Sequence, residues 1–146
     1  MEKFKWAIVG TGYIANQFAE GMREVEDAAI AAVVSRSAES GERYARAHHA
    51  AAVYTDFDEM LEREEIDAVY LAIPNDCHYA YIMKALEKGV PVLSEKPMVD
   101  NARQLEAVLQ KAEEKGVFLM EGMWTRCFPA VIRPAGGSRR AGSARP

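Results

Sequence analysis

Residues 4–15 read FKWAIVGTGYIA, a short apolar run followed by a pattern of small residues. Gly10 permits a tight turn out of a strand, Gly12 lets backbone approach a pyrophosphate, and Ala15 permits close packing of a helix on that strand. A helix beginning near residue 13 would aim free N–H groups at a phosphate. The stretch therefore predicts a dinucleotide-binding turn, against the alternative of a purely structural turn. We expect its contacts to come from Gly10, Thr11, Gly12, Tyr13 and Ile14.

The remainder of the chain repeats this rhythm of strand and helix. Apolar runs predict strands at residues 4–10, 28–35, 52–55, 67–73, 90–94 and 117–121. Helical spacing predicts helices at residues 13–24, 38–48, 56–63, 76–88 and 101–115. The run at 28–35 shows no polar–apolar alternation, which indicates a strand covered on both faces. We therefore predict an α/β fold, a Rossmann-type doubly wound parallel sheet of about six strands.

Residues that favour helix ends punctuate this pattern. Asp56 and Asp100 stand where N-caps are needed, and Gly89 and Gly116 stand where two helices stop. His48 falls late in a helix, followed by a second histidine, where a charged imidazolium suits the helix dipole.

Composition and charge narrow the function. The 146 residues are 49% apolar and 27% charged, as in one soluble globular domain. Residues 134–146 hold three arginines and no acid, so the net charge of −4 leaves −7 for the rest of the chain (−4 − 3). Such a body has no charge-based reason to bind nucleic acid or an anionic membrane. No run reaches transmembrane length and no signal peptide is expected. Cys77 and Cys127 have no metal-type spacing, so we expect inert thiols, no metal site and a reduced, cytoplasmic setting.

The end of the second strand bears on the choice of nucleotide. NAD enzymes usually carry Asp or Glu there, to accept hydrogen bonds from the adenosine ribose. This chain has Ser35, Arg36 and Ser37, and no acid before Glu39. A guanidinium flanked by two hydroxyls suits a 2′-phosphate, so we predict NADP rather than NAD. The alternative is an ordinary exposed loop arginine.

Polar clusters follow three further strands. They are PNDCH at 74–78, SEKP at 94–97 and EGMWTR at 121–126. The carboxyl ends of parallel strands share one edge, where ligands bind in this architecture. We expect Lys96 near the nicotinamide, partly buried at the cleft floor, with Glu95 on the ribose and Pro97 fixing the backbone. Pro74 and the polar residues that follow it, like those at the other two strand ends, are therefore candidates for the cofactor site.

Taken in order, GTGYIA, SRS, IPNDCH, SEKP and MEGMWTR make residues 4 to about 132 similar to one family. The chain resembles the glucose–fructose oxidoreductase / inositol dehydrogenase / MocA family, with the Glu-Lys-Pro triplet as its most specific mark. The EGMWTR segment most resembles the dimeric dihydrodiol dehydrogenase and NADP-dependent xylose dehydrogenase branch. The resemblance implies that Lys96 sits at the reacting oxygen of the substrate, as hydrogen-bond donor or proton relay. It places Asn75 and His78 around the nicotinamide ribose, and Trp124 and Arg126 along the cofactor cleft.

The same resemblance raises a question of completeness. Family members continue into a second α+β domain that contributes substrate contacts, and they form homo-oligomers. Here the pattern ends near residue 132, so we expect an NAD(P)-binding domain over 1–132 and a disordered tail over 133–146, from a frameshift or truncation or as a native tail. Two functions remain open. One is NADP-dependent hydride transfer to or from a small sugar or cyclic diol. The other is a nucleotide-binding fragment that is catalytically incomplete.

Overall fold

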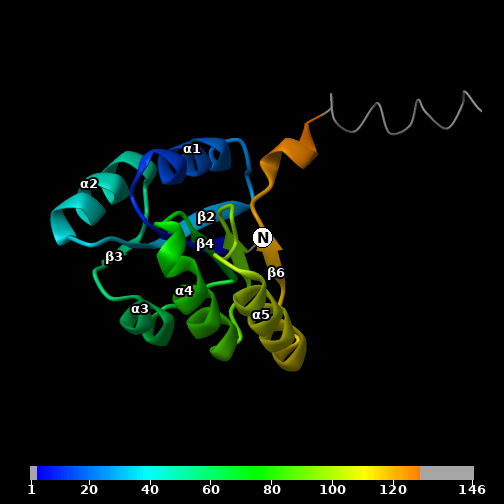
Figure 1. The fold of residues 1–146 in the computed structure, drawn as a ribbon. Helices are drawn as coiled ribbons and strands as arrows, with labels where there is room; N and C mark the ends of the chain where they lie inside the picture. The colour runs from blue at the N-terminus through cyan, green and yellow to red at the C-terminus, as the bar shows by residue number, and fades with distance from the viewer. Residues whose placement is uncertain (1–2, 129–146) are drawn as a thin grey trace, which may run out of the picture.

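The computed structural model describes residues 3–128, so the tail expected over 133–146 and the expected domain end at 132 lie outside the described residues. Its centre is one parallel sheet in the order β3-β2-β1-β4-β5-β6 (Figure 1). The strands are β1 (Phe4–Val9), β2 (Ala28–Val34), β3 (Ala52–Tyr54), β4 (Ala68–Leu71), β5 (Val92–Ser94) and β6 (Leu119–Glu121). The strand order reverses between β1 and β4, so a crevice is expected there at the carboxyl edge.

Five α-helices and one 3₁₀ turn complete the fold. They are α1 (Tyr13–Met22), α2 (Ala38–His48), α3 (Phe57–Arg63), α4 (Asn75–Glu87), α5 (Ala102–Lys115) and η1 (Trp124–Cys127). In Figure 1, α1 and α2 lie on one face of the sheet, and α3, α4 and α5 lie on the other. The predicted doubly wound sheet of six strands is therefore confirmed, with element ends within about two residues of those expected.

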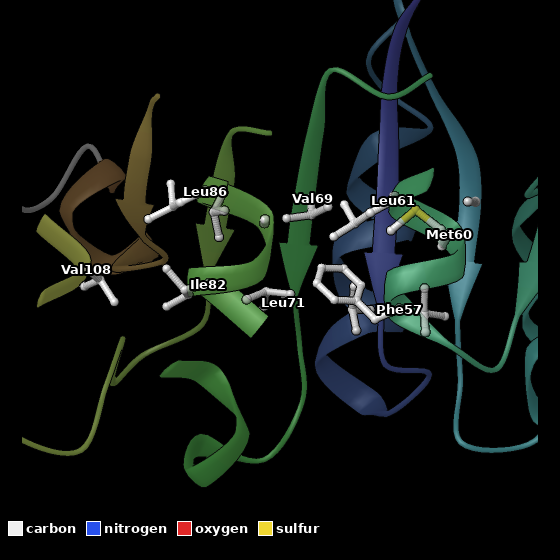
Figure 2. Close-up of a cluster of buried hydrophobic side chains, with 14 of the residues drawn as sticks. Phe57, Met60, Leu61, Val69, Leu71, Ile82, Leu86 and Val108 are labelled. Atoms are coloured by element: carbon white, nitrogen blue, oxygen red, sulfur yellow. The ribbon is translucent and has the colours of Figure 1, made fainter. Parts of the chain in front are cut away.

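Successive side chains along the central strands point to opposite faces of the sheet, so each face has its own hydrophobic core. In β1, Ala7 and Val9 point to one face, while Ile8 points to the other. The face under α3, α4 and α5 holds the larger cluster, and Figure 2 shows its apolar side chains meeting between sheet and helices. The face under α1 and α2 holds the smaller one, where Phe18 stacks on Tyr70 with ring centroids 3.9 Å apart.

Helix caps agree with the sequence in one case and correct it in another. The Asp56 carboxylate accepts a 2.8 Å hydrogen bond from the Glu59 N–H, as predicted. The prediction that Asp100 caps α5 was wrong, because Asn101 is the N-cap and accepts from the Gln104 N–H at 3.0 Å. The side-chain oxygen of Gln104 in turn accepts from the Asp100 N–H at 3.1 Å, one residue before the N-cap, so the two side chains together fix the start of α5.

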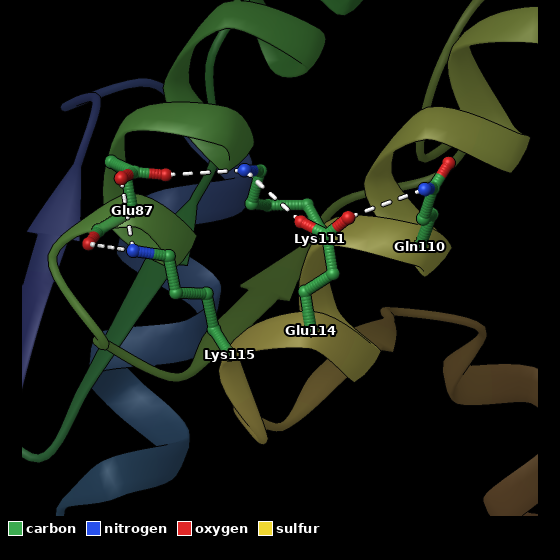
Figure 3. Close-up of polar contacts among 5 residues, drawn as sticks. All are labelled: Glu87, Gln110, Lys111, Glu114 and Lys115. Atoms are coloured by element: carbon green, nitrogen blue, oxygen red, sulfur yellow. Dashed lines mark hydrogen bonds and ion pairs between the residues drawn. The ribbon is translucent and has the colours of Figure 1, made fainter.

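Ion pairs join α4 to α5 on the outer surface. Glu87 at the end of α4 receives Lys115 at 2.9 Å and Lys111 at 3.3 Å, both from α5 (Figure 3). Lys111 also pairs with Glu114, 3.3 Å away on its own helix. These contacts hold the last turns of the two helices together beside the buried Val108.

Among the described residues, none of the helices is both long and apolar enough to cross a membrane.

Candidate functional site

The glycine-rich turn after β1 is held by close backbone contact. Gly10 has φ +103°, and a Cβ there would lie 2.3 Å from the Ala72 carbonyl oxygen. The backbone N–H of Gly10 donates to Val34, and that of Ala72 donates to Val9. Gly10 is therefore required by the fold, because β1 and β4 come together at this point.

Gly12 is different, because nothing in the described protein requires it to be glycine. Its φ is −79°, and a Cβ built there meets no atom within 4 Å. The residue is the N-cap of α1 and provides no side-chain cap, so the first N–H groups of the helix are left to another acceptor. Beside it, Tyr13 and Ile14 are 74% and 45% exposed. An open helix N-terminus beside a missing side chain fits a pyrophosphate.

Hydroxyl groups link this turn to the end of β2. Thr11 Oγ1 lies 2.8 Å from Ser40 Oγ and 3.4 Å from Ser35 Oγ. Ser35 is buried, and its backbone N–H donates to Tyr54. Ser37 caps α2 by accepting from the Ser40 N–H at 3.3 Å, which leaves its O–H proton available to a ligand. Of the two serines predicted at this point, Ser35 thus belongs to a hydroxyl cluster with Thr11 and Ser40, and Ser37 adjoins it through the backbone N–H of Ser40.

Arg36 stands at the open side of that cluster. Its side chain is exposed and makes no hydrogen bond or ion pair with any residue in the described part of the chain. The other arginines of α2 are occupied, since Arg43 pairs with Glu39 at 3.6 Å and Arg46 pairs with Glu42 at 3.8 Å. Arg36 is therefore a cation available to a phosphate.

The end of β4 presents two of its predicted residues to solvent and buries the third. Pro74 is the N-cap of α4, and Pro74 and Asn75 are exposed. His78 has no exposed surface, and its Nδ1 and Nε2 lie 2.9 Å from the Pro97 carbonyl and 3.0 Å from the Ile73 carbonyl. Both ring nitrogens are therefore engaged by backbone, and His78 joins the end of β4 to the loop after β5.

Glu95 is fixed where β5 ends. Its Oε1 accepts a 2.7 Å hydrogen bond from the Tyr70 hydroxyl, and its Oε2 accepts from the backbone N–H of Lys96 at 3.3 Å. Burial, followed by the bond to Glu95, raises the pKa of Tyr70, so the phenol remains the donor. The carboxylate can still accept a ribose hydroxyl through its remaining lone pairs.

Lys96 presents its ammonium group to solvent at the carboxyl edge of the sheet. It makes no hydrogen bond or ion pair with the described residues, and the residue is exposed, so the expected partial burial was wrong. The loop around it is well fixed, because the Glu95 N–H donates to Leu71 at 3.0 Å and Glu121 Oε1 accepts from the Met98 N–H at 2.8 Å. A rigid loop therefore presents a flexible cation.

The segment after β6 closes the row of strand ends. The Gly122 N–H donates to the Ser94 carbonyl at 2.7 Å, and a Cβ at Gly122 would lie 3.2 Å from that oxygen. Trp124 is 58% exposed and meets Phe128 edge-on, with centroids 5.1 Å apart, while Arg126 is exposed in the same turn. The structure thus brings the predicted strand ends to one edge.

Three contributors to this edge were missed from the sequence. Tyr70 holds Glu95, Ser40 holds Thr11, and Asn16 donates to the carbonyl oxygens of the glycine-rich turn. Tyr70 lies within a strand and Asn16 within a helix, so each looked like ordinary packing or solvent-facing polarity. A tyrosine in an otherwise apolar strand is the one signal that was available, because a buried hydroxyl needs a partner.

A cavity of about 760 Å³ lies elsewhere, at the amino ends of the strands. Phe4, Asp27, Asp67 and Val90 line it, and each stands at or just before the start of a strand. Ligands of doubly wound sheets bind at the carboxyl ends, so this hollow is not the candidate site.

Comparison with known proteins places the chain among oxidoreductases. A family model described as "Oxidoreductase family, NAD-binding Rossmann fold" matches residues 4–123. The chain is 38% identical over 125 residues to scyllo-inositol 2-dehydrogenase (NADP(+)) IolU of Bacillus subtilis (strain 168), covering 86% of this chain and 38% of that protein. It is 32% identical over 129 residues to trans-1,2-dihydrobenzene-1,2-diol dehydrogenase of Sus scrofa, covering 87% of this chain and 38% of that protein. The chain thus spans well under half the length of both relatives.

Solved structures agree in fold. Scyllo-inositol dehydrogenase from Lactobacillus casei, with bound NAD(H) and scyllo-inositol, superposes with a TM-score of 0.86 at 25% identity, over 97% of this chain and 42% of that one. GenD2 from gentamicin A biosynthesis, in complex with NAD, gives 0.89 at 26% identity, over 96% of this chain and 40% of that one.

Proposed function

Because the chain belongs to the Gfo/Idh/MocA oxidoreductase family and matches its NAD-binding Rossmann fold, we propose that residues 3–128 bind NADP(H) along the carboxyl edge of the sheet. The N-terminus of α1, with its glycine at position 12, takes the pyrophosphate. Arg36, with the hydroxyls of Ser35 and Ser37, takes the 2′-phosphate. The observation that carries the proposal is Gly12, the N-cap of α1, where no side chain caps the helix and the described protein leaves open space that a pyrophosphate would fit.

Preference for NADP over NAD follows from charge at the end of β2. A 2′-phosphate needs a cation and hydrogen-bond donors, and Arg36 is exposed with no partner in the described chain. The nearest acid on α2, Glu39, pairs with Arg43 instead of facing a ribose. The NADP(+) in the name of the Bacillus relative supports this choice, whereas the NAD complexes of two structural neighbours favour the alternative.

We propose a CH–OH group of a sugar or cyclic diol as the substrate. The names of two relatives, an inositol dehydrogenase and a dihydrodiol dehydrogenase, support this class. Bound nicotinamide supplies the hydride chemistry at its C4 atom. Lys96 stabilises charge on the substrate oxygen and hands on its proton, because its ammonium group is free at the end of β5. Glu95, fixed by Tyr70, accepts from the nicotinamide ribose.

A nucleotide-binding fragment without turnover is the second candidate. It is favoured by the length of the chain, which spans 38% of the relatives' length. Calorimetric titration with NADPH and NADH tests the binding proposal shared by both candidates, and NADPH oxidation with a panel of ketoses, aldoses and diketones separates them. We expect tighter binding of NADPH than of NADH. Failure to bind either nucleotide at millimolar concentration would overturn the proposed function.

A further inference from the structure

We propose that Asn16 and His48, which lie outside the glycine-rich turn, are positioning residues that orient its phosphate-binding N–H groups. The inference rests on the proposed dinucleotide site. Asn16 is in the first turn and a half of α1, and its Nδ2 donates to the Gly12 carbonyl at 2.7 Å and to the Thr11 carbonyl at 3.3 Å. Its Oδ1 lies 2.6 Å from Nε2 of His48, at the end of α2.

Because a peptide group is planar, these contacts also set the direction of the neighbouring backbone N–H groups. In a trans peptide the C=O of one residue and the N–H of the next point in opposite directions. Holding the Thr11 and Gly12 carbonyls toward Asn16 therefore turns the N–H groups of Gly12 and Tyr13 away from it. The backbone N–H of Asn16, 3.1 Å from the Gly12 carbonyl oxygen, acts in the same sense, so the side chain alone holds the Thr11 carbonyl. Neither of those N–H groups has an acceptor within residues 3–128, and both residues are exposed. They are the donors that a pyrophosphate would meet.

The contact with His48 fixes which way the Asn16 amide points. The two turn carbonyls only accept, so the Asn16 NH₂ must face them and its oxygen must face His48. His48 must then donate from Nε2, which leaves Nδ1 as the bare nitrogen. Nδ1 is buried and has no hydrogen-bond partner in the described structure, as expected for that neutral tautomer.

Electrostatics around His48 agree with a neutral ring. Burial, followed by the charge of Arg23, lowers the pKa of His48, and His49 acts in the same sense. Glu20 on α1 is the one acid that opposes them, and Tyr44 meets the ring with centroids 4.5 Å apart. These causes oppose the charged imidazolium that the helix dipole led us to expect at His48. A proton on Nδ1 would be buried without an acceptor, at a cost exceeding that of a surface dipole contact.

A matched pair of α1 variants tests the role of Asn16. We expect Asn16→Ala to weaken NADPH binding about tenfold, as for the loss of two neutral hydrogen bonds. Gln17→Ala, one position along, removes only an exposed contact with Glu20 and should leave the affinity within about twofold. An Asn16→Ala protein that binds NADPH as tightly as the Gln17→Ala protein would overturn the inference.

Variants at His48 separate orientation from packing. His48→Phe keeps the ring against Tyr44 but removes the donor, and should weaken binding about threefold. His48→Gln places an amide N–H near the Nε2 position and should restore it to within about twofold. Adding His48→Phe to Asn16→Ala should cause no further loss, because His48 acts through Asn16. An additive loss would mean that His48 serves only the packing of α2, and would count against the proposal.

Nuclear magnetic resonance of the nucleotide-free protein gives a readout that does not depend on binding. Long-range ¹H–¹⁵N spectra should show His48 protonated at Nε2 and bare at Nδ1 near pH 7.5. The amide resonances of Gly12 and Tyr13 should move in Asn16→Ala and stay in place in Gln17→Ala. If the Gly12 and Tyr13 amide resonances do not move in Asn16→Ala, the inference is wrong even if the parent protein binds NADPH. If they move but the parent protein binds neither nucleotide, the inference about the turn holds and the proposed function is wrong.

Discussion

At the scale of single residues, two glycines two positions apart have different reasons to be glycine. Gly10 is required by the fold, since φ is +103° and a Cβ would lie 2.3 Å from the Ala72 oxygen. Gly12 has an ordinary φ and open space around it. We therefore expect the first glycine to matter for stability and the second for binding.

Substitution should separate these two roles. We expect Gly10→Ala to lower the free energy of unfolding by about 2–4 kcal/mol, through strain and a backbone clash. Gly12→Val should lower it by about 1 kcal/mol or less, as for a weakened N-cap, but should abolish NADPH binding. Urea unfolding and calorimetric titration measure the two quantities. Normal NADPH binding by a folded Gly12→Val protein would contradict the proposed pyrophosphate position.

Arg36 decides the predicted preference between nucleotides. Arg36→Ala removes a charge-assisted phosphate contact, which contributes roughly 1.5–3 kcal/mol. The variant should lose that amount for NADPH and little for NADH. Arg43→Ala is the control, since Arg43 lies in the neighbouring helix and is already paired with Glu39. Equal losses for the two nucleotides in parallel titrations would remove Arg36 from the 2′-phosphate site.

The role proposed for Lys96 concerns turnover and not the affinity for the cofactor. Its ammonium group contacts none of the described residues, so Lys96→Met should leave NADPH affinity of this chain within a few-fold. In a version of this protein restored to full length, the same substitution should reduce turnover by roughly 10²–10⁴, as for loss of a general acid–base group. Near-normal turnover by that variant would rule out the proposed proton relay.

At the scale of elements, α4 and α5 are joined by a cluster whose strength depends on pH. Hydrogen bonds from Lys115 and Lys111 lower the pKa of Glu87 below its ordinary value of 4.5. A carboxylate with a lowered folded pKa adds stability above the unfolded pKa, and that stability is lost as pH falls through the folded pKa. Glu87 is on the surface, so its effect is small and screened by salt.

The comparison of Glu87→Gln with the parent protein tests this. The melting temperature of the variant should be slightly lower at pH 7, and the difference should shrink below pH 4.5 and again at about 1 M salt. Glu106→Gln is the control, because Glu106 is exposed on α5 without a partner in the described residues. A difference that stays constant from pH 7 to pH 3 would mean that Glu87 acts through something other than these ion pairs.

At the scale of the whole molecule, binding and chemistry are expected to separate. The residues proposed to hold the nucleotide come from the ends of β1, β2 and β5, which the described chain contains in full. The substrate side is less complete, since Lys96 faces solvent and the chain spans 38% of the relatives' length. We therefore expect this 146-residue chain to bind NADPH without oxidising it.

Measuring the rate of NADPH oxidation in the presence of ketoses, aldoses or diketones checks that expectation, with the Bacillus relative as the positive control. Turnover by the 146-residue chain near that of the relative would contradict the fragment interpretation. Binding without turnover would agree with it, because transition-state stabilisation needs groups on both sides of the substrate.

The sequence by itself determined the architecture. Local signals are strong in such a fold: unbroken apolar runs predict covered strands, glycines predict turns, and residues such as Asp56 predict helix caps. The hydrogen bond of the Asp56 cap joins residues only three positions apart, so it depends on local sequence alone. The glycine-rich turn and the Glu-Lys-Pro triplet are equally local, so the family followed from them. Asp100 and Asn101 could both cap α5. We predicted Asp100 from the sequence, whereas Asn101 is the N-cap in the structure.

Only the tertiary structure decided how distant residues meet. It brought Tyr70 to Glu95, 25 residues away, and His48 to Asn16, 32 residues away. It also buried His78 between two carbonyl oxygens and left Lys96 in solvent. The physical reason is that the burial and pairing of a side chain depend on which elements pack together. The pattern of residues within one element does not show which other element will pack against it. The tautomer proposed for His48 follows from that packing, because its buried Nδ1 has no acceptor among the described residues.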